Sequence, residues 1–206
     1  MPYELHLVSN GEMALEQLAA VAGEVAPYVD AIHLREKRRT AAELLAAVEM
    51  MLRAGVPRAK IIVNDRADVA WAARVGGVHL AHHSLPVQAV RQMHGERQVL
   101  RIGRSVHEAA EARIAARDGA DYVFFGHVYH SASKPGLPAR GLAALADTAG
   151  STAIPVLAIG GIEPRHVPEL LQHGAAGIAV MGGIWNAPRP SEAAQQYRMM
   201  LQKEGE

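Results

Sequence analysis

The 206-residue chain contains no cysteine and few aromatic side chains, with two Phe, two Trp and five Tyr. The lack of cysteine excludes disulfides, iron–sulfur clusters, thiolate zinc sites and a cysteine nucleophile. The chain also lacks an excess of charge of either sign, since 21 Lys and Arg balance 21 Asp and Glu. Proteins that bind nucleic acid or anionic membranes by general electrostatic attraction carry a marked basic excess. We therefore expect neither as a partner.

Long hydrophobic runs are missing as well. No apolar segment of the sequence approaches the ~20 residues that a membrane-spanning helix needs, and the first residues, MPYELH, have neither the basic nor the apolar part of a secretory leader. Half of the residues are apolar and 20% are charged, a balance typical of a globular chain with a core. We expect a single cytoplasmic domain over residues 1–206.

Short apolar runs alternate with longer stretches rich in Ala, Leu, Glu and Arg. The runs predict eight strands, at Glu4–Val8, Ala31–Arg35, Lys60–Asn64, Gly77–Ala81, Val99–Gly103, Tyr122–Val128, Pro155–Gly160 and Gly177–Met181. The stretches between them predict helices, for instance Ala14–Glu24, Ala41–Arg53, Val87–Met93, His107–Arg117 and Pro164–His173. Strands that alternate with helices favour parallel pairing through right-handed crossovers. Eight such units predict an α/β fold, a (β/α)8 TIM barrel, with a doubly wound open sheet as the alternative.

Two glycine pairs follow the last two predicted strands, Gly160-Gly161 and Gly182-Gly183. Glycine leaves backbone N–H groups unshielded and tolerates positive φ, so such turns can form anion nests. The loops after strands seven and eight are also the usual phosphate site of a barrel. Each pair alone is equally compatible with a tight turn that binds nothing. The two together predict a phosphate site.

Other polar side chains lie at the ends of earlier strands. Arg35 and Lys37 alternate at the end of the second predicted strand, so both could face the barrel mouth and meet a carboxylate or phosphate. His127 lies near the end of the sixth, where an imidazole can take up and return a proton at neutral pH. A histidine that only caps its strand is the plain alternative. The long irregular segment Tyr129–Arg140 follows, and long loops in compact domains are often functional.

Metal ligands are sparse in this pattern. His82 and His83 are adjacent and would face opposite sides of a strand, so they do not easily share an ion. A Mg²⁺–diphosphate site favours paired carboxylates, whereas Asn64-Asp65 offers one acid and is followed by Arg66. We therefore expect no metal site.

Six segments, in order along essentially the whole chain, carry a family resemblance. They are His33-Leu34-Arg35-Glu36-Lys37, Asn64-Asp65-Arg66, Gly77-Val78-His79-Leu80, Gly103-Arg104-Ser105-Val106-His107, Asp121–Lys134 and Ile159-Gly160-Gly161-Ile162. Together they resemble the thiamine phosphate synthase/TenI superfamily, which implies a (β/α)8 barrel. The synthase branch joins a pyrimidine diphosphate to a thiazole phosphate and binds Mg²⁺ through two aspartates. Those positions read Arg66 and Ser84 here, and a glutamine of the synthase pattern reads His33.

The thiazole tautomerase (TenI) branch is the more similar of the two in these segments. Its catalytic histidine corresponds to His127, where the synthase has a proline. The resemblance therefore implies a metal-independent isomerase of thiamine biosynthesis that needs no cofactor. His127 would move one proton from the ring carbon beside the substrate carboxylate to the exocyclic carbon, which makes a carboxy-thiazole phosphate aromatic. Its replacement by Ala should nearly silence the enzyme.

The resemblance also implies how a small-molecule thiazole phosphate would be held. Backbone N–H groups would bind the phosphate, at Gly160, Gly161, Met181, Gly182 and Gly183. Side chains would bind the rest of the substrate, at Arg35, Lys37, Asn64, Ser105 and Lys134. The resemblance also implies a homodimer. Two alternatives stay open: a Mg²⁺-dependent thiamine phosphate synthase, and a non-catalytic regulator that binds a thiazole or thiamine phosphate.

Overall fold

The computed structural model describes residues 3–93, 100–131 and 136–204. Eight parallel strands close into a barrel in sequence order, and β8 completes the ring by pairing with β1. The strands are β1 (Glu4–Val8), β2 (Ala31–Leu34), β3 (Ile61–Asn64), β4 (Gly77–Leu80), β5 (Arg101–Val106), β6 (Tyr122–Gly126), β7 (Val156–Ile159) and β8 (Gly177–Val180). The predicted (β/α)8 barrel is thus confirmed, and the open-sheet alternative is wrong.

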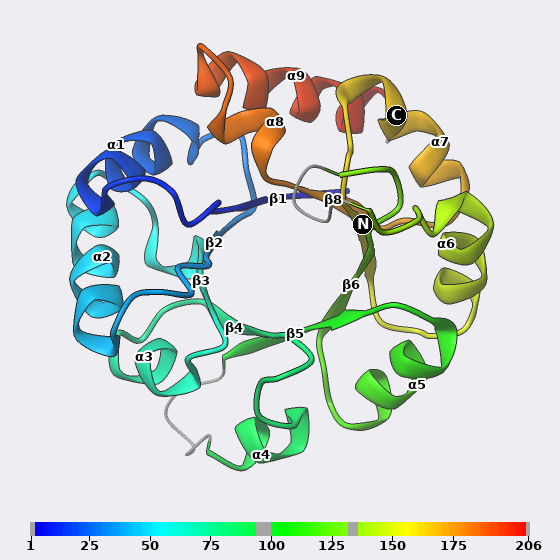
Figure 1. The fold of residues 1–206 in the computed structure, drawn as a ribbon, viewed down its shortest axis with the longest axis horizontal. Coiled ribbons are helices and arrows are strands. Elements are labelled where there is room, and N and C mark those ends of the chain that lie inside the picture. The colour runs from blue at the N-terminus through cyan, green and yellow to red at the C-terminus, as the bar shows by residue number, and fades with distance from the viewer. Residues whose placement is uncertain (1–2, 94–99, 132–135, 205–206) are drawn as a thin grey trace.

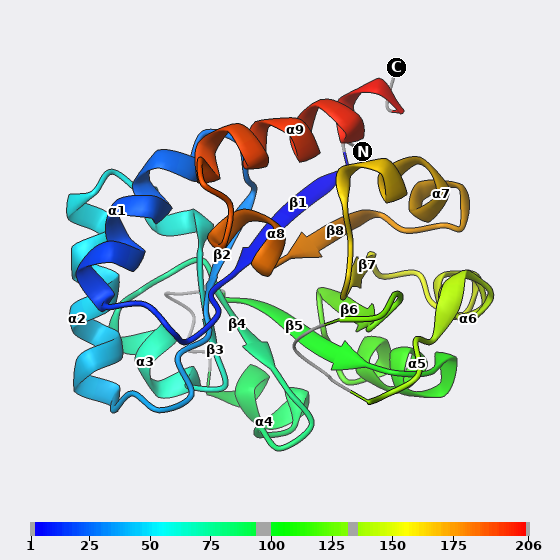
Figure 2. The same ribbon diagram turned by 45° about the horizontal axis from the view of Figure 1, so that its top comes forward.

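Helices form a ring around the strands (Figure 1). They are α1 (Leu15–Val25), α2 (Ala41–Arg53), α3 (Ala67–Ala72), α4 (Val87–Gln92), α5 (Ala109–Arg117), α6 (Gly141–Gly150), α7 (Val167–Gln172), α8 (Gly182–Trp185) and α9 (Pro190–Lys203), with short 3-10 turns η1 (Arg58–Lys60) and η2 (Pro164–His166). The C-terminal helix α9 contacts both α1 and α7 and so closes the ring, and Figure 2 shows it running beside β1. None of these described helices is long and apolar enough to cross a membrane.

Helix α2 shows how the sequence produces this ring. Thr40 caps its first turn, because the Thr40 hydroxyl accepts a hydrogen bond from the Glu43 N–H while the Glu43 carboxylate accepts one from the Thr40 N–H. Its buried residues recur at three- and four-residue spacing and face the barrel, namely Leu44, Ala47, Val48 and Met51. The helix therefore packs one apolar face and leaves the other to solvent.

Each strand buries both of its faces, but in different surroundings. In β6, Tyr122 and Phe124 belong to a small cluster inside the barrel with Val8, Leu157 and Ala179. The alternate residues of β6, Val123 and Phe125, belong to the large core between the barrel and the helices. The strand period of two thus assigns every second residue to the barrel interior.

Several boundaries differ from those expected. Strand β2 ends at Leu34, one residue before Arg35, and β6 ends at Gly126 rather than Val128. Strand β5 runs over Arg101–Val106 instead of Val99–Gly103, and Val99 lies outside the described residues. The apolar-run criterion misplaced β5 because its second half carries Arg104 and Ser105.

Candidate active site

The carboxyl ends of the eight strands meet at one end of the barrel, which is where enzymes of this fold place their chemistry. The residues predicted as functional follow or end different strands, so closure of the barrel gathers them at one mouth. Lys134 lies outside the described residues, so its role stays a prediction.

The glycine turns lie side by side at this mouth. Gly160 and Gly161 have φ of 103° and 67°, in the region that favours glycine. A Cβ on Gly160 would lie 2.4 Å from the Cβ of His127, and one on Gly161 would lie 2.2 Å from the His130 carbonyl oxygen. The pairing of Ile159 with Ala179 sets this turn beside the end of β8. Both positions therefore require glycine, as an anion nest would.

The second glycine pair opens α8 directly after Met181. A Cβ on Gly183 would lie 2.4 Å from the Tyr197 hydroxyl, so this glycine also serves the packing of α8 against α9. The structure therefore brings all five predicted phosphate-binding residues to adjacent strand ends. Phosphate binding by their N–H groups stays a prediction.

His127 lies against the first glycine turn and is 5% exposed. Its Nε2 is 3.4 Å from the Leu137 carbonyl oxygen, in the loop after β6. Its Nδ1 is buried and has no hydrogen-bond partner among the described residues. A buried polar atom without a partner is costly, which fits an atom reserved for a ligand.

Asn64 and Ser105 are joined by histidines that the sequence reasoning did not place in the site. Asn64 Oδ1 lies 3.2 Å from His33 Nδ1, and Ser105 Oγ lies 2.9 Å from His79 Nε2. The rings of His33 and His79 are 5.3 Å apart, centroid to centroid, and both face the barrel interior. The floor of the mouth is thus built from imidazole rings.

A chain of polar side chains continues below this floor. His33 Nε2 lies 2.9 Å from His6 Nδ1, and His6 Nε2 lies 2.6 Å from Glu4 Oε2. Arg101 donates two hydrogen bonds of 2.8 Å to the Glu4 carboxylate. The signal that reveals this chain is alternation, since these residues occupy every second position of their strands and so point inward.

Burial sets the charges in this interior. Burial lowers the pKa of His79 to about 3, and the positive charges of Arg104 and Arg35 add to the effect. Burial likewise lowers the pKa of His33 well below its ordinary value. Burial raises the pKa of Glu4, but the hydrogen bonds from His6 and Arg101 outweigh it and bring the value to about 2. The floor is therefore neutral imidazole above an ionised carboxylate.

The two predicted basic residues after β2 differ in placement. The Arg35 N–H donates to Ser9 Oγ at 2.8 Å, and the Ser9 hydroxyl donates to the buried Glu36 carboxylate at 2.6 Å. Arg35 is partly buried at the carboxyl end of β2. Lys37 is exposed in the following turn. The structure thus brings Arg35 into the site and leaves Lys37 at its edge.

One carboxylate stands at the ends of β3 and β4. Asp65 has a left-handed backbone with φ of 64°, and its Oδ1 accepts hydrogen bonds from Ser84 Oγ at 2.5 Å and from the Ala81 N–H at 3.3 Å. Arg66, which follows it, forms two hydrogen bonds of 2.9 and 2.6 Å with Asp68. The Arg66 charge is therefore compensated by Asp68.

Within residues 3–93, 100–131 and 136–204, no group of three or more His, Asp or Glu is arranged to hold a metal ion. Mg²⁺ is commonly held by one or two carboxylates together with substrate phosphates. The oxygens of Asp65 and Ser84 fit that second arrangement.

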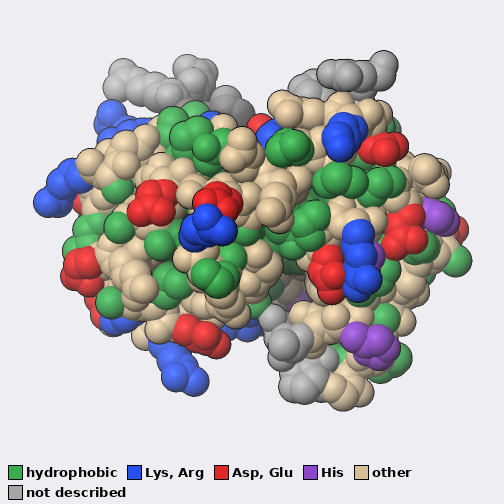
Figure 3. All heavy atoms as spheres, turned by 90° about the horizontal axis from the view of Figure 1, so that it is seen from above, with side chains coloured by type: hydrophobic (Ala, Val, Ile, Leu, Met, Phe, Trp, Pro, Cys, Tyr) green, Lys and Arg blue, Asp and Glu red, His purple; other side chains and the backbone are tan. Residues whose placement is uncertain are grey.

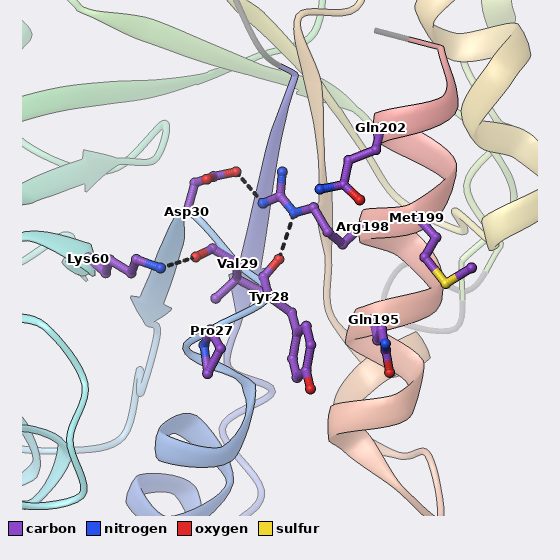
Figure 4. A pocket seen from close by; sticks show the side chains of 9 residues that line it. All are labelled: Pro27, Tyr28, Val29, Asp30, Lys60, Gln195, Arg198, Met199 and Gln202. Atoms are coloured by element: carbon purple, nitrogen blue, oxygen red, sulfur yellow. Dashed lines mark hydrogen bonds and ion pairs between the residues drawn. The ribbon is translucent and has the colours of Figure 1, made fainter. Parts of the chain in front are cut away.

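A pocket of about 390 Å³ lies elsewhere, between the turn before β2 and α9 (Figure 4). Its cations are already engaged with backbone oxygens. Lys60 donates to the Ala26 and Val29 carbonyls at 2.8 and 2.7 Å, and Arg198 donates to the Tyr28 carbonyl at 2.9 Å. This pocket therefore joins structural elements and carries none of the predicted functional residues. On the face shown in Figure 3, acidic and basic side chains are interspersed rather than gathered by sign.

Comparison with known proteins identifies the family. The sequence profile of the thiamine monophosphate synthase family matches residues 5–184. The chain is 41% identical to the thiamine-phosphate synthase of Chlorobium luteolum, over 82% of this chain and 80% of that protein. It is 39% identical to the thiamine-phosphate synthase of Anaeromyxobacter dehalogenans, over 94% and 86% respectively. It also resembles the solved thiamine phosphate pyrophosphorylase of Pyrococcus furiosus, with 27% identity, a TM-score of 0.81, and coverage of 98% of this chain and 96% of that one.

These findings correct the predicted activity. The relatives are named synthases, so the assignment to a metal-independent thiazole tautomerase, with His127 as its proton carrier, is wrong. That assignment gave weight to Arg66 at a position where the synthase pattern has a metal ligand, whereas the Arg66 guanidinium is turned to Asp68 and paired with it. It also treated Ser84 as a lost ligand, whereas the Ser84 hydroxyl supports Asp65. The chain belongs to the thiamine monophosphate synthase family.

Proposed function

We propose that this chain is a thiamine-phosphate synthase, a transferase that joins a pyrimidine diphosphate to a thiazole phosphate. The observation that carries the proposal is the 39% identity to the Anaeromyxobacter dehalogenans synthase over 94% of the chain. Two glycine turns, a basic residue and a carboxylate at one barrel mouth support the proposal.

The bond changes explain which side chains such a site needs. The bond between the pyrimidine methylene carbon and the diphosphate oxygen breaks, and a bond forms between that carbon and the thiazole ring nitrogen. Diphosphate leaves with the electron pair, and the ring nitrogen becomes a thiazolium cation. No proton is transferred, so neither a general base nor a protein nucleophile is required. The demands on the protein are alignment of the two substrates and stabilisation of the leaving negative charge.

The mouth meets these demands with groups on different strands. In this proposal the glycine turns after β7 and β8 hold the thiazole phosphate through backbone N–H groups. Arg35, which follows β2, faces the diphosphate, and Lys37 lies at the edge of the mouth. Lys134 lies outside the described residues and is proposed as a further substrate ligand. Asn64 and Ser105, on the histidine floor, contact the pyrimidine ring.

Asp65 and Ser84 would supply protein oxygen donors for a Mg²⁺ ion at this mouth. When bound, the ion would neutralise charge that develops on the departing diphosphate. The Ala81 N–H and the Ser84 hydroxyl donate to Asp65 Oδ1, and Asp65 Oδ2 lies 3.6 Å from His83 Nε2, so the orientation of this carboxylate is set by its neighbours.

The test is an assay of the purified chain with 4-amino-5-hydroxymethyl-2-methylpyrimidine diphosphate, the phosphorylated thiazole and Mg²⁺, with thiamine phosphate quantified by chromatography. We expect stoichiometric formation of thiamine phosphate and diphosphate, and loss of product when the cation is chelated. Failure to couple the two substrates at any Mg²⁺ concentration, with the protein folded, would overturn the proposal.

A further inference from the structure

Four side chains form a single file of hydrogen bonds through the barrel, from its closed end to the mouth. We call Glu4, His6, His33 and Asn64 the histidine relay. Arg101 anchors its lower end by gripping both oxygens of Glu4. His6 and His33 have no exposed surface, so neither can touch a ligand at the mouth. Asn64 alone is partly exposed there. Within the relay, the buried members can act on a ligand only through Asn64.

The hydrogen-bonding capacity of the groups fixes where the protons lie. A carboxylate only accepts, so the Glu4 carboxylate requires the proton of His6 on Nε2. A neutral His6 then offers a lone pair at Nδ1, which requires the proton of His33 on Nε2. A neutral His33 in turn offers a lone pair at Nδ1, toward Asn64. Each histidine is thus held in one tautomer by the group below it.

Neutral rings are what the surroundings favour. Burial lowers the pKa of both His6 and His33, although the Glu4 carboxylate opposes the effect at His6. Around His33, the charged or titratable groups are His6, His79, Tyr122 and, farther away, Arg101. Phe124 covers one side of the ring at 4.9 Å between centroids.

The last step concerns the Asn64 amide. A half-turn about the Asn64 Cβ–Cγ bond exchanges the positions of Oδ1 and Nδ2. As placed, Asn64 Oδ1 lies 3.2 Å from His33 Nδ1. Two lone pairs facing each other repel, whereas the amide N–H would donate to the His33 lone pair. We propose that the histidine relay is a positioning device that turns the Asn64 Nδ2 toward His33 and presents Oδ1 to the barrel mouth as a fixed hydrogen-bond acceptor.

A fixed acceptor at Asn64 Oδ1 makes the mouth selective for ligands that present a hydrogen-bond donor. Under the proposed function, on which this step rests, an acceptor here suits the exocyclic amine of an aminopyrimidine and disfavours a ring that presents a carbonyl oxygen instead. If the Asn64 amide could turn freely, it would hydrogen-bond to either kind of ring. The relay therefore restricts which ring binds without any buried histidine touching it.

The proton positions are testable without enzymatic activity. In the protein labelled with ¹⁵N at histidine, we expect the Nδ1 atoms of His6 and His33 to give signals of unprotonated ring nitrogen and their Nε2 atoms to give signals of N–H, with assignment from spectra of H6Q and H33Q. A neutral His33 ring protonated on Nδ1 would overturn the proposal, because the Asn64 oxygen would then face it.

Binding tests the consequence at the mouth. The probes are the aminopyrimidine diphosphate and, as a ringless control, inorganic diphosphate, each titrated by calorimetry with Mg²⁺. Loss of one oriented hydrogen bond should weaken aminopyrimidine binding to H33L about tenfold while leaving diphosphate binding unchanged. H33Q should retain binding, because a glutamine can donate to His6 and accept from Asn64 as the histidine does.

A double-mutant cycle separates positioning from a general structural effect. If His33 acts through Asn64, H33L should cost little further affinity in an N64A background. Equal losses for both probes, or additive losses in the cycle, would overturn the proposal. If the wild-type chain binds diphosphate but not the aminopyrimidine, the proposed function fails, while the nitrogen signals still decide the orientation of Asn64. If H33L does not fold, the binding measurements on H33Q and the ¹⁵N signals of His6 and His33 still test the proposal.

Discussion

At the scale of single residues, the proposed chemistry depends most on Asp65, because its carboxylate is the charged oxygen ligand of the mouth. Asn tolerates the left-handed backbone of this position and can accept the same hydrogen bonds from Ala81 and Ser84. Asp65→Asn should therefore remove the charge and keep the geometry. We expect kcat/KM to fall by about 100-fold or more, with little change in Tm.

The neighbouring Arg66 provides a matched control. Its guanidinium is paired with Asp68, so Arg66→Ala should change kcat/KM by no more than about twofold, since an exposed ion pair contributes little. Both variants would be measured by steady-state kinetics over a range of Mg²⁺ concentrations. An Asp65→Asn enzyme as active as Arg66→Ala would remove Asp65 from the site.

His127 calls for a different expectation. Because the proposed transfer moves no proton, its imidazole is not needed as an acid or base, and its unpartnered Nδ1 is suited to contact a bound ligand. His127→Asn should raise KM for the thiazole phosphate and lower kcat by less than about tenfold, whereas loss of a general base costs roughly 10²–10⁴. Varying each substrate at saturation of the other separates the two effects. A kcat lowered about 1,000-fold would contradict this expectation and show that His127 acts in the chemical step.

At the scale of secondary-structure elements, the sequence predicts best what is decided locally. The bounds of β1 and α2 agree with the prediction at both ends, because an apolar run or an amphipathic face with its cap is contained in the segment itself. The glycine turns were found for the same reason. Strand β5 was misplaced because its second half carries Arg104 and Ser105, which do not read as part of an apolar run when the segment is taken alone. The histidine relay likewise joins residues of β1, β2 and β3, which become neighbours only when the barrel forms.

The turn after β7 gives a prediction at this scale. Gly160→Ala would place a methyl group against His127 at a φ of 103°, and should destabilise the fold by about 3 kcal/mol while weakening phosphate binding. Gly150, at the end of α6, is the control, since a Cβ there meets no atom within 4 Å. Urea unfolding and phosphate titration of both variants make the comparison. Equal stability of the two would show that the turn adapts.

At the scale of the whole molecule, the activity was misjudged because it was inferred from a few positions. Arg66 and Ser84 were judged as isolated replacements of metal ligands, but the effect of a side chain depends on where the fold turns it. Similarity along the full chain carried more weight, because it reflects the combined arrangement of all strand ends. The expected homodimer depends on a surface that no single chain reveals, and it stays a prediction.

The barrel interior makes stability depend on pH as a property of the entire fold. His6, His33 and His79 are buried with lowered pKa values, the last at about 3, so the folded chain binds fewer protons than the unfolded chain below pH ~6.5. Their contribution is complete above pH ~6.5 and is lost progressively as the pH falls toward the folded values. The ionised Glu4 adds a further loss only below pH ~4.5.

We therefore expect the free energy of unfolding to fall by up to about 4 kcal/mol between pH 7 and pH 5.5, as three buried imidazoles come to favour the unfolded chain. Urea titrations across this range measure it. H33Q should remove about a third of the dependence, because one titrating group leaves the interior. A free energy of unfolding that stays constant over this pH range would mean that the buried histidines take up protons in the folded chain. A protonated His33 has no lone pair at Nδ1, so it could not hold Asn64 in the orientation that the relay requires.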